Sequence, residues 1–177
     1  MTRYAVLLRG INLGKARRVG MADLRAVLTE SGYGDVRTLL QSGNVVLDAD
    51  EDAGTLRQSV ERVLADRFGF GVDALVRSRD DLATVVARNP FATVATDGSK
   101  YVVAFLAEPP SRPLAQLLGD VDLGADRYEM VGTELYAWCP DGLQKSPLMG
   151  ALGKLKGGPS ATVRNWNTVE KLVALLA

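Results

Sequence analysis

The chain has 177 residues, 47% of them hydrophobic and 24% charged, with equal numbers of acidic and basic side chains. This composition is typical of a soluble globular protein, and no apolar run approaches the roughly 18 residues of a membrane span. The absence of histidine excludes Ser-His and Cys-His catalysis and histidine metal sites, and the single cysteine, Cys139, cannot form an internal disulfide. We therefore expect a cytoplasmic protein with no membrane association, no metal and no cofactor.

The first half of the chain alternates between apolar runs and helical spacing. Strands are predicted for residues 4–8, 36–40, 45–47 and 71–77. Helices are predicted for residues 21–31, for 55–68 with Thr55 and Gln58 as a capping box, and for 78–88 with Ser78 and Asp81 as its cap. A glycine- and arginine-rich loop occupies residues 10–20, and residues 41–44 form a hairpin-like turn.

The same order recurs after residues 93–99, which form the best linker of the chain. Strands are predicted for residues 101–106, 127–131, 135–138 and 161–164. Between them lie a short helix that Ser111 would cap and a helix beginning at Ser146-Pro147, where serine is the N-cap and proline the first helical residue. A last helix carries Val169, Leu172 and Leu176. Cys139, within a strand-like run, is expected to be an inert small hydrophobe.

An internal repeat relates the two halves. Residues 76–87 and 163–174 align at an offset of 87, which superposes the Val-Arg pairs, an apolar pair and the final alanines. The sequence therefore predicts an α/β fold of the α+β type, with two tandem ferredoxin-like βαββαβ repeats packed together, each with an extra helix. We assign residues 1–92 and 99–177 to the two domains, and expect Arg77 and Arg164 at equivalent strand ends.

Charge is unevenly distributed along the chain. Residues 1–47 carry seven basic and three acidic groups, residues 143–177 carry five and one, and the middle carries nine and seventeen. If the two ends meet in space, they form one basic patch that would suit a phosphate-bearing partner. The alternative is ordinary solvated surface charge.

Polar side chains collect at predicted strand ends and at helix starts, where unpaired N–H groups favour an anion. Arginine supplies paired donors and amides can both donate and accept, so we select seven candidate ligand-binding residues. They are Arg9, Asn12, Gln41, Asn44, Lys145, Arg164 and Asn165. The alternative is that they serve turns, caps and strand-end carbonyls, with Asn167 capping the last helix and Trp166 contributing packing.

Four short motifs together resemble one known family. They are Arg9-Gly10-Ile11-Asn12, Gln41-Ser42-Gly43-Asn44, Asn89-Pro90-Phe91 and Arg164-Asn165-Trp166-Asn167-Thr168. Their combination is similar to the bacterial family of domains of unknown function numbered 1697, and the resemblance runs nearly from end to end. It implies an α/β fold of ferredoxin-like repeats in a small cytoplasmic bacterial protein, and it implies no activity.

The leading hypothesis is a protein that binds a phosphate-bearing ligand, either a nucleotide or a nucleic acid. One alternative is an enzyme acting on such a ligand, with Lys145 and the arginines stabilising charge. Another is a protein-interaction module without catalysis, which would dimerise through a sheet edge or an apolar face.

Overall fold

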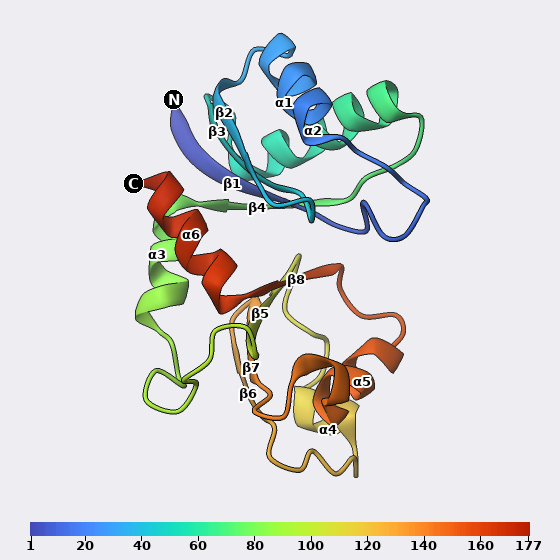
Figure 1. Cartoon of the computed structure of the whole chain (residues 1–177), viewed down its shortest axis with the longest axis vertical. Helices are drawn as coiled ribbons and strands as arrows, with labels where there is room; N and C mark the ends of the chain where they lie inside the picture. The colour runs from blue at the N-terminus through green and yellow to red at the C-terminus, as the bar shows by residue number, and fades with distance from the viewer. The chain divides into compact units, whose positions relative to one another are not determined.

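Two four-stranded antiparallel sheets form the framework of the chain, which a computed structural model describes over all of residues 1–177 (Figure 1). The first repeat contains β1 (Thr2–Leu8), α1 (Met21–Glu30), β2 (Gly34–Leu39), β3 (Asn44–Ala49), α2 (Ala53–Phe68), β4 (Ala74–Ser78) and α3 (Arg79–Ala87). The second contains β5 (Tyr101–Leu106), α4 (Leu114–Leu118), β6 (Arg127–Val131), β7 (Glu134–Trp138), the 3₁₀ turn η1 (Leu143–Lys145), α5 (Pro147–Lys154), β8 (Ala161–Asn165) and α6 (Trp166–Leu176).

The strand order confirms the predicted ferredoxin-like topology. The first sheet runs β2-β3-β1-β4 and the second runs β6-β7-β5-β8, so equivalent strands occupy equivalent places. All neighbouring strands are antiparallel. The segments that repeat in the sequence also have matching elements: β4 and β8 each have five residues, and α3 and α6 each begin at the next residue.

The duplicated arginines confirm the equivalence. Arg77 is the fourth residue of β4 and Arg164 is the fourth residue of β8. Arg77 pairs in register with Ala5 on β1, and Arg164 pairs with Val103 on β5. Each arginine also donates from Nη1 to the carbonyl oxygen of the residue before it, at 3.1 Å for Arg77 and 2.9 Å for Arg164.

The chain divides into two compact units. The first unit comprises Met1–Thr84 and Lys171–Ala177, and the second comprises Val85–Glu170. The divisions fall inside α3 and inside α6. The domain ranges 1–92 and 99–177 describe the sequence repeats, and they stay a prediction.

Each unit has its own hydrophobic core on one face of its sheet. In the first unit, Leu24 of α1 and Leu56 of α2 pack with Val6 of β1 in a single buried cluster. In the second unit, Val102 of β5 packs in a cluster with Cys139, which is fully buried as expected. Burial raises the pKa of the Cys139 thiol, because the thiolate would lose its hydration.

The first residues of three helices show which of the predicted helix caps are correct. Ser78 and Asp81 form the predicted reciprocal cap of α3, with bonds of 2.8 and 3.1 Å between side chains and backbone N–H groups. The prediction for α2 is wrong, because Asp52 is the N-cap and its carboxylate accepts from the backbone N–H of Thr55 at 3.0 Å. The prediction that Ser111 caps α4 is also wrong, since this helix follows Pro113 and has no side-chain cap.

Candidate functional site

Four of the predicted ligand-binding residues lie together at one end of the first sheet. The backbone N–H of Leu8, the last residue of β1, donates to the carbonyl oxygen of Gly43 at 2.8 Å. The Asn12 side chain donates to the carbonyl oxygen of Gln41 at 2.8 Å. The segment that follows β1, with Arg9 and Asn12, is therefore joined to the turn between β2 and β3, with Gln41 and Asn44.

Asn12 holds the loop of residues 10–20 closed. Its Nδ2 donates to the carbonyl oxygen of Val19 at 2.9 Å as well as to Gln41, and its Oδ1 accepts from the Val19 N–H at 2.9 Å. Its backbone has a φ of 54°, a left-handed conformation that asparagine tolerates better than most residues. Both amide hydrogens of Asn12 are thus used within the protein, and its role here is to fix the loop.

Arg17 anchors the same loop at a second point, and the sequence contained no signal for it. Its Nε donates to the carbonyl oxygen of Gly10 at 2.8 Å, and its Nη2 donates to that of Gly71. Its guanidinium also lies 4.9 Å from the centroid of the Phe70 ring, within cation–π range. Arg17 is therefore committed to internal contacts, although it lies in the same loop as the predicted ligand-binding residue Asn12.

The turn between β2 and β3 is built by Gly43 and Asn44. Asn44 is completely buried as the first residue of β3, where its Nδ2 donates to the carbonyl oxygen of Leu39 at 2.7 Å. Gly43 has a φ of 85°, and a Cβ atom there would lie 2.7 Å from Cδ1 of Ile11. Asn44 thus supports the turn, whereas Gln41 and Arg9 have exposed side chains.

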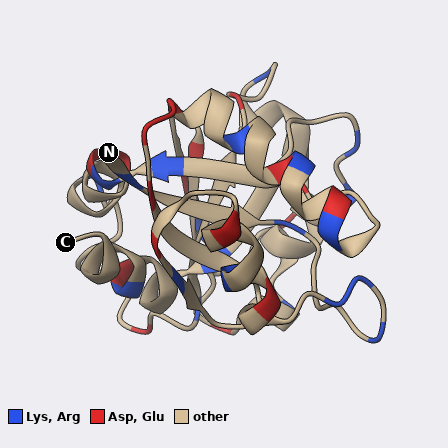
Figure 2. Cartoon of the chain, turned by 90° about the horizontal axis from the view of Figure 1, so that it is seen from above, with Lys and Arg blue, Asp and Glu red and all other residues tan.

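Two further cations, Lys15 and Arg18, project from the anchored loop. Both side chains are exposed, and neither takes part in an ion pair. Residues 10–20 contain three basic groups and no acidic one, so the loop is a local positive feature. Figure 2 shows basic and acidic residues interspersed on the helices, strands and loops of the chain.

The remaining three predicted residues belong to the second unit. Lys145 is exposed at the end of η1, just before α5, and Ser146 is the N-cap of that helix as predicted. The first donors of α5 are already used. The buried carboxylate of Asp126 accepts from the Leu148 N–H at 3.2 Å and from the Ser146 hydroxyl at 2.6 Å. Pro147 has no N–H, and the Met149 N–H donates to Ser146 Oγ at 2.9 Å.

The Asp126 carboxylate thus occupies the position beside the start of α5 where an external anion would otherwise bind. Asp126 lies 20 residues before Ser146 in the sequence, so no local motif indicated this contact. Lys145 consequently stands beside a helix start whose nearest donors are engaged.

Arg164 and Asn165 have internal roles at the end of β8. Arg164 is only 7% exposed, and its Nη1 donates to Thr162 Oγ1 at 2.6 Å as well as to a backbone carbonyl. Burial lowers the pKa of Arg164 to about 10, because the charged form loses hydration, and the side chain stays protonated at neutral pH. Asn165 caps α6 by accepting from the Thr168 N–H at 2.9 Å, so the expectation that Asn167 is the cap is wrong.

Trp166 packs instead of presenting a stacking surface. Its ring stacks on that of Tyr101 with centroids 5.0 Å apart, and its Nε1 donates to Glu170 at 3.0 Å. The hydroxyl of Tyr101 donates to Oδ1 of Asn89 at 2.7 Å, and Phe91 meets the Tyr101 ring edge-on. The motifs around Asn89 and Trp166 therefore serve one aromatic cluster in the second unit.

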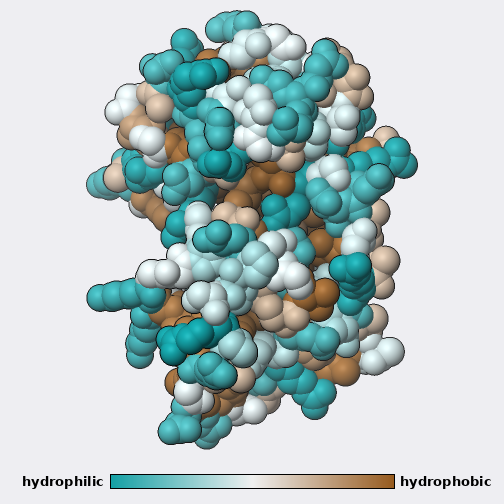
Figure 3. All heavy atoms as spheres, turned by 180° about the vertical axis from the view of Figure 1, so that it is seen from behind, coloured by the Kyte–Doolittle hydropathy of each residue, from teal (hydrophilic) through white to brown (hydrophobic).

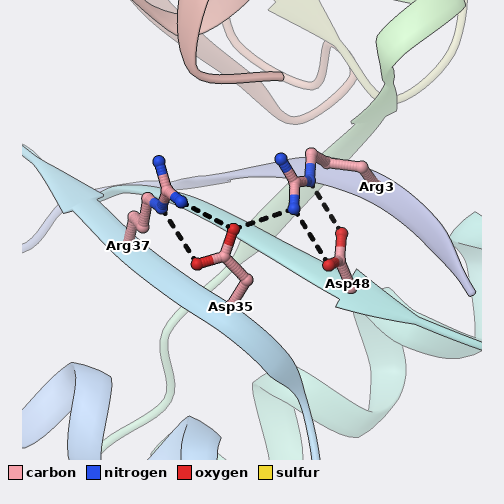
Figure 4. Close-up of polar contacts among 4 residues, drawn as sticks. All are labelled: Arg3, Asp35, Arg37 and Asp48. Atoms are coloured by element: carbon pink, nitrogen blue, oxygen red, sulfur yellow. Dashed lines mark hydrogen bonds and ion pairs between the residues drawn. The ribbon is translucent and has the colours of Figure 1, made fainter. Parts of the chain in front are cut away.

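A charged network on the first sheet is internally neutralised. Arg3 donates to both carboxylate oxygens of Asp48, at 2.8 and 3.0 Å, and to Asp35 at 2.8 Å (Figure 4). Arg37 donates to the same Asp35. The hydrogen bond from Arg3 lowers the pKa of Asp48 below its usual range. These four charged residues are paired with one another, and we do not assign a ligand-binding site to them.

No group of three or more cysteine, aspartate or glutamate side chains is arranged to hold a metal ion. No helix has both the length and the apolar character required to cross a bilayer.

Comparisons with known proteins agree with the motifs. A family model described as "Protein of unknown function (DUF1697)" matches residues 1–136. Among solved structures, the conserved bacterial protein SP0830 from Streptococcus pneumoniae is similar, with 25% sequence identity and a TM-score of 0.79 over 99% of each chain. No curated protein matches. The likeness to SP0830 over nearly the full length indicates that both repeats are shared.

Proposed function

Because the chain belongs to the family described as protein of unknown function DUF1697, the family supplies no activity, and we propose a function from the site itself. The protein binds the phosphate groups of a nucleotide or nucleic acid at the end of its first unit, through Lys15 and Arg18 with Arg9 and Gln41 beside them. One observation supports this most directly: Lys15 and Arg18 are exposed, form no ion pair and stand on an anchored loop.

The anchoring matters because binding orders flexible groups at a cost in entropy. The contacts of Asn12 and Arg17 hold the backbone of the loop in place before any ligand arrives. Only the side-chain rotamers of Lys15 and Arg18 remain to be ordered. The exposed amide of Gln41 adds a donor and an acceptor close to Asn12, where a base or sugar could hydrogen-bond.

Fluorescence anisotropy with labelled RNA, DNA and ATP, each titrated at two salt concentrations, tests the proposal. We expect the affinity to fall as salt rises, because binding to phosphates releases counterions. The double variant Lys15→Ala/Arg18→Ala should weaken binding at least tenfold and reduce the salt dependence. Arg62→Ala, which removes one exposed cation that forms no ion pair from α2, is the control for the effect of one charge and should bind as the wild type does.

Two results would refute the proposal. One is the absence of measurable binding to all three probes at low salt. The other is a loss of binding free energy per removed charge that is the same for the double variant and for Arg62→Ala, which would show only a response to net charge.

A further inference from the structure

Two exposed leucines stand at the same end of the first unit as the unpaired cations. Leu13 is 71% exposed and Leu40 is 52% exposed. Leu13 follows Asn12 in the chain and Leu40 precedes Gln41, and the Asn12 side chain is bonded to the Gln41 carbonyl. The hydrogen bond thus brings the two leucines onto neighbouring segments. On the face drawn in Figure 3, hydrophobic residues are exposed between larger hydrophilic areas.

Leu40 is unfavourable in two ways. Its φ is 62°, in the left-handed region where a leucine side chain crowds its own backbone, and where glycine or asparagine is normally found. That conformation also directs an apolar side chain into water. A turn that needed only to connect β2 and β3 would be more stable with asparagine at this position. Strained backbone that the surrounding structure maintains is typical of functional sites.

We infer that the ligand of this surface is a single-stranded nucleic acid, an inference that rests on the proposed function. Unstacked bases expose apolar faces, which Leu13 and Leu40 can contact, while Lys15 and Arg18 meet the phosphates between them. A duplex keeps its base faces stacked inside, so it offers the leucines nothing apolar.

The charge near the two leucines favours a negatively charged partner over a neutral or positive one. The loop carries Lys15, Arg17 and Arg18 without an acidic residue, and residues 39–47 carry no charge at all. Within these two segments the leucines are accompanied by positive charge alone, which matches a polyanion. An exposed acidic residue, Asp73, lies just before β4, and its carbonyl oxygen accepts from the Arg9 N–H at 2.9 Å. A single nucleotide has one base and few phosphates, whereas a strand presents successive bases and phosphates to both segments.

Anisotropy with a labelled single-stranded 12-mer, the matched duplex and ATP tests the inference with the full chain. The single strand should bind at least tenfold more tightly than either of the others. Leu13→Ser and Leu40→Asn should each weaken single-strand binding at least threefold and leave its salt dependence unchanged, because neither removes a charge. Lys15→Ala should reduce the salt dependence. Val121→Ser, which changes an exposed apolar residue of the second unit, should have no effect.

Leu40→Asn also separates a binding role from a structural one. Asparagine tolerates this backbone conformation, so the variant should melt at the wild-type temperature or above it while losing affinity. Equal affinity for duplex and single strand would overturn the inference, as would wild-type binding by both leucine variants, although the proposed function would stand. No binding to any probe would overturn both.

Discussion

The start of α5 allows the sharpest test of how the second unit is held together. The Asp126 carboxylate accepts two hydrogen bonds in a buried setting, one from the Ser146 hydroxyl and one from the Leu148 N–H. Hydrogen bonds to charged groups contribute about 1.5–3 kcal/mol each, and the desolvation of a buried carboxylate offsets part of this. Asp126→Ala should therefore lower the free energy of unfolding by about 2–4 kcal/mol.

Ser146→Ala removes the N-cap as well as the donor to Asp126. Loss of an N-cap alone costs about 1–2 kcal/mol. Because Asp126 and Ser146 share a hydrogen bond, the double variant should be less destabilised than the two single effects added, by at least about 1 kcal/mol. Urea unfolding followed by the fluorescence of the buried Trp138 and Trp166 measures all four proteins. Additive effects, or a loss below about 0.5 kcal/mol for Asp126→Ala, would refute the role of the carboxylate.

The same pair of residues bears on Lys145. Since Asp126 already supplies negative charge to the helix start, we expect inorganic phosphate to bind beside Lys145 only after Asp126→Ala opens the position. Phosphate should then raise the melting temperature of the Asp126→Ala variant and not that of the wild type. Adding Lys145→Ala to this variant should remove the effect, and by itself it should change stability by about 0–1 kcal/mol. Phosphate stabilisation of the wild type that Lys145→Ala removes would contradict the account.

Three further predictions concern other parts of the chain. Gly43→Ala should cost about 2–4 kcal/mol in urea unfolding, because of its positive φ and the crowding of a Cβ. Because the pKa of Asp48 is lowered in the folded state, its contribution to the free energy of unfolding is present above the usual aspartate pKa and is lost as pH falls through the folded-state pKa. Asp48→Asn should therefore make the free energy of unfolding less dependent on pH in the acid range, whereas the exposed control Asp66→Asn should not. The buried Cys139 should react with a thiol reagent only as fast as the protein opens, and Cys139→Ala should cost about 1 kcal/mol.

Local pattern in the sequence was sufficient for the architecture. The repeat at an offset of 87 located Arg77 and Arg164 at equivalent positions of β4 and β8, because a duplicated segment folds in the same local way. Ser78 and Ser146 were recognised as caps because each has its partner three residues away in the sequence. The same spacing fits both Asp52 and Thr55, and for α2 the sequence analysis chose the wrong one.

The tertiary structure decided which polar residues remain available to a ligand. Asn12, Asn44 and Asn165 were chosen because turns and binding sites favour the same residue types, and only their partners in space show that they hold the backbone. Arg17 reaches the Gly71 carbonyl across 54 residues, and Asp126 reaches Ser146 across 20. Contacts between residues so far apart in the sequence depend on the tertiary fold, and no local spacing indicates them. They also decide that Arg17 is bonded within the protein whereas Lys15 remains exposed.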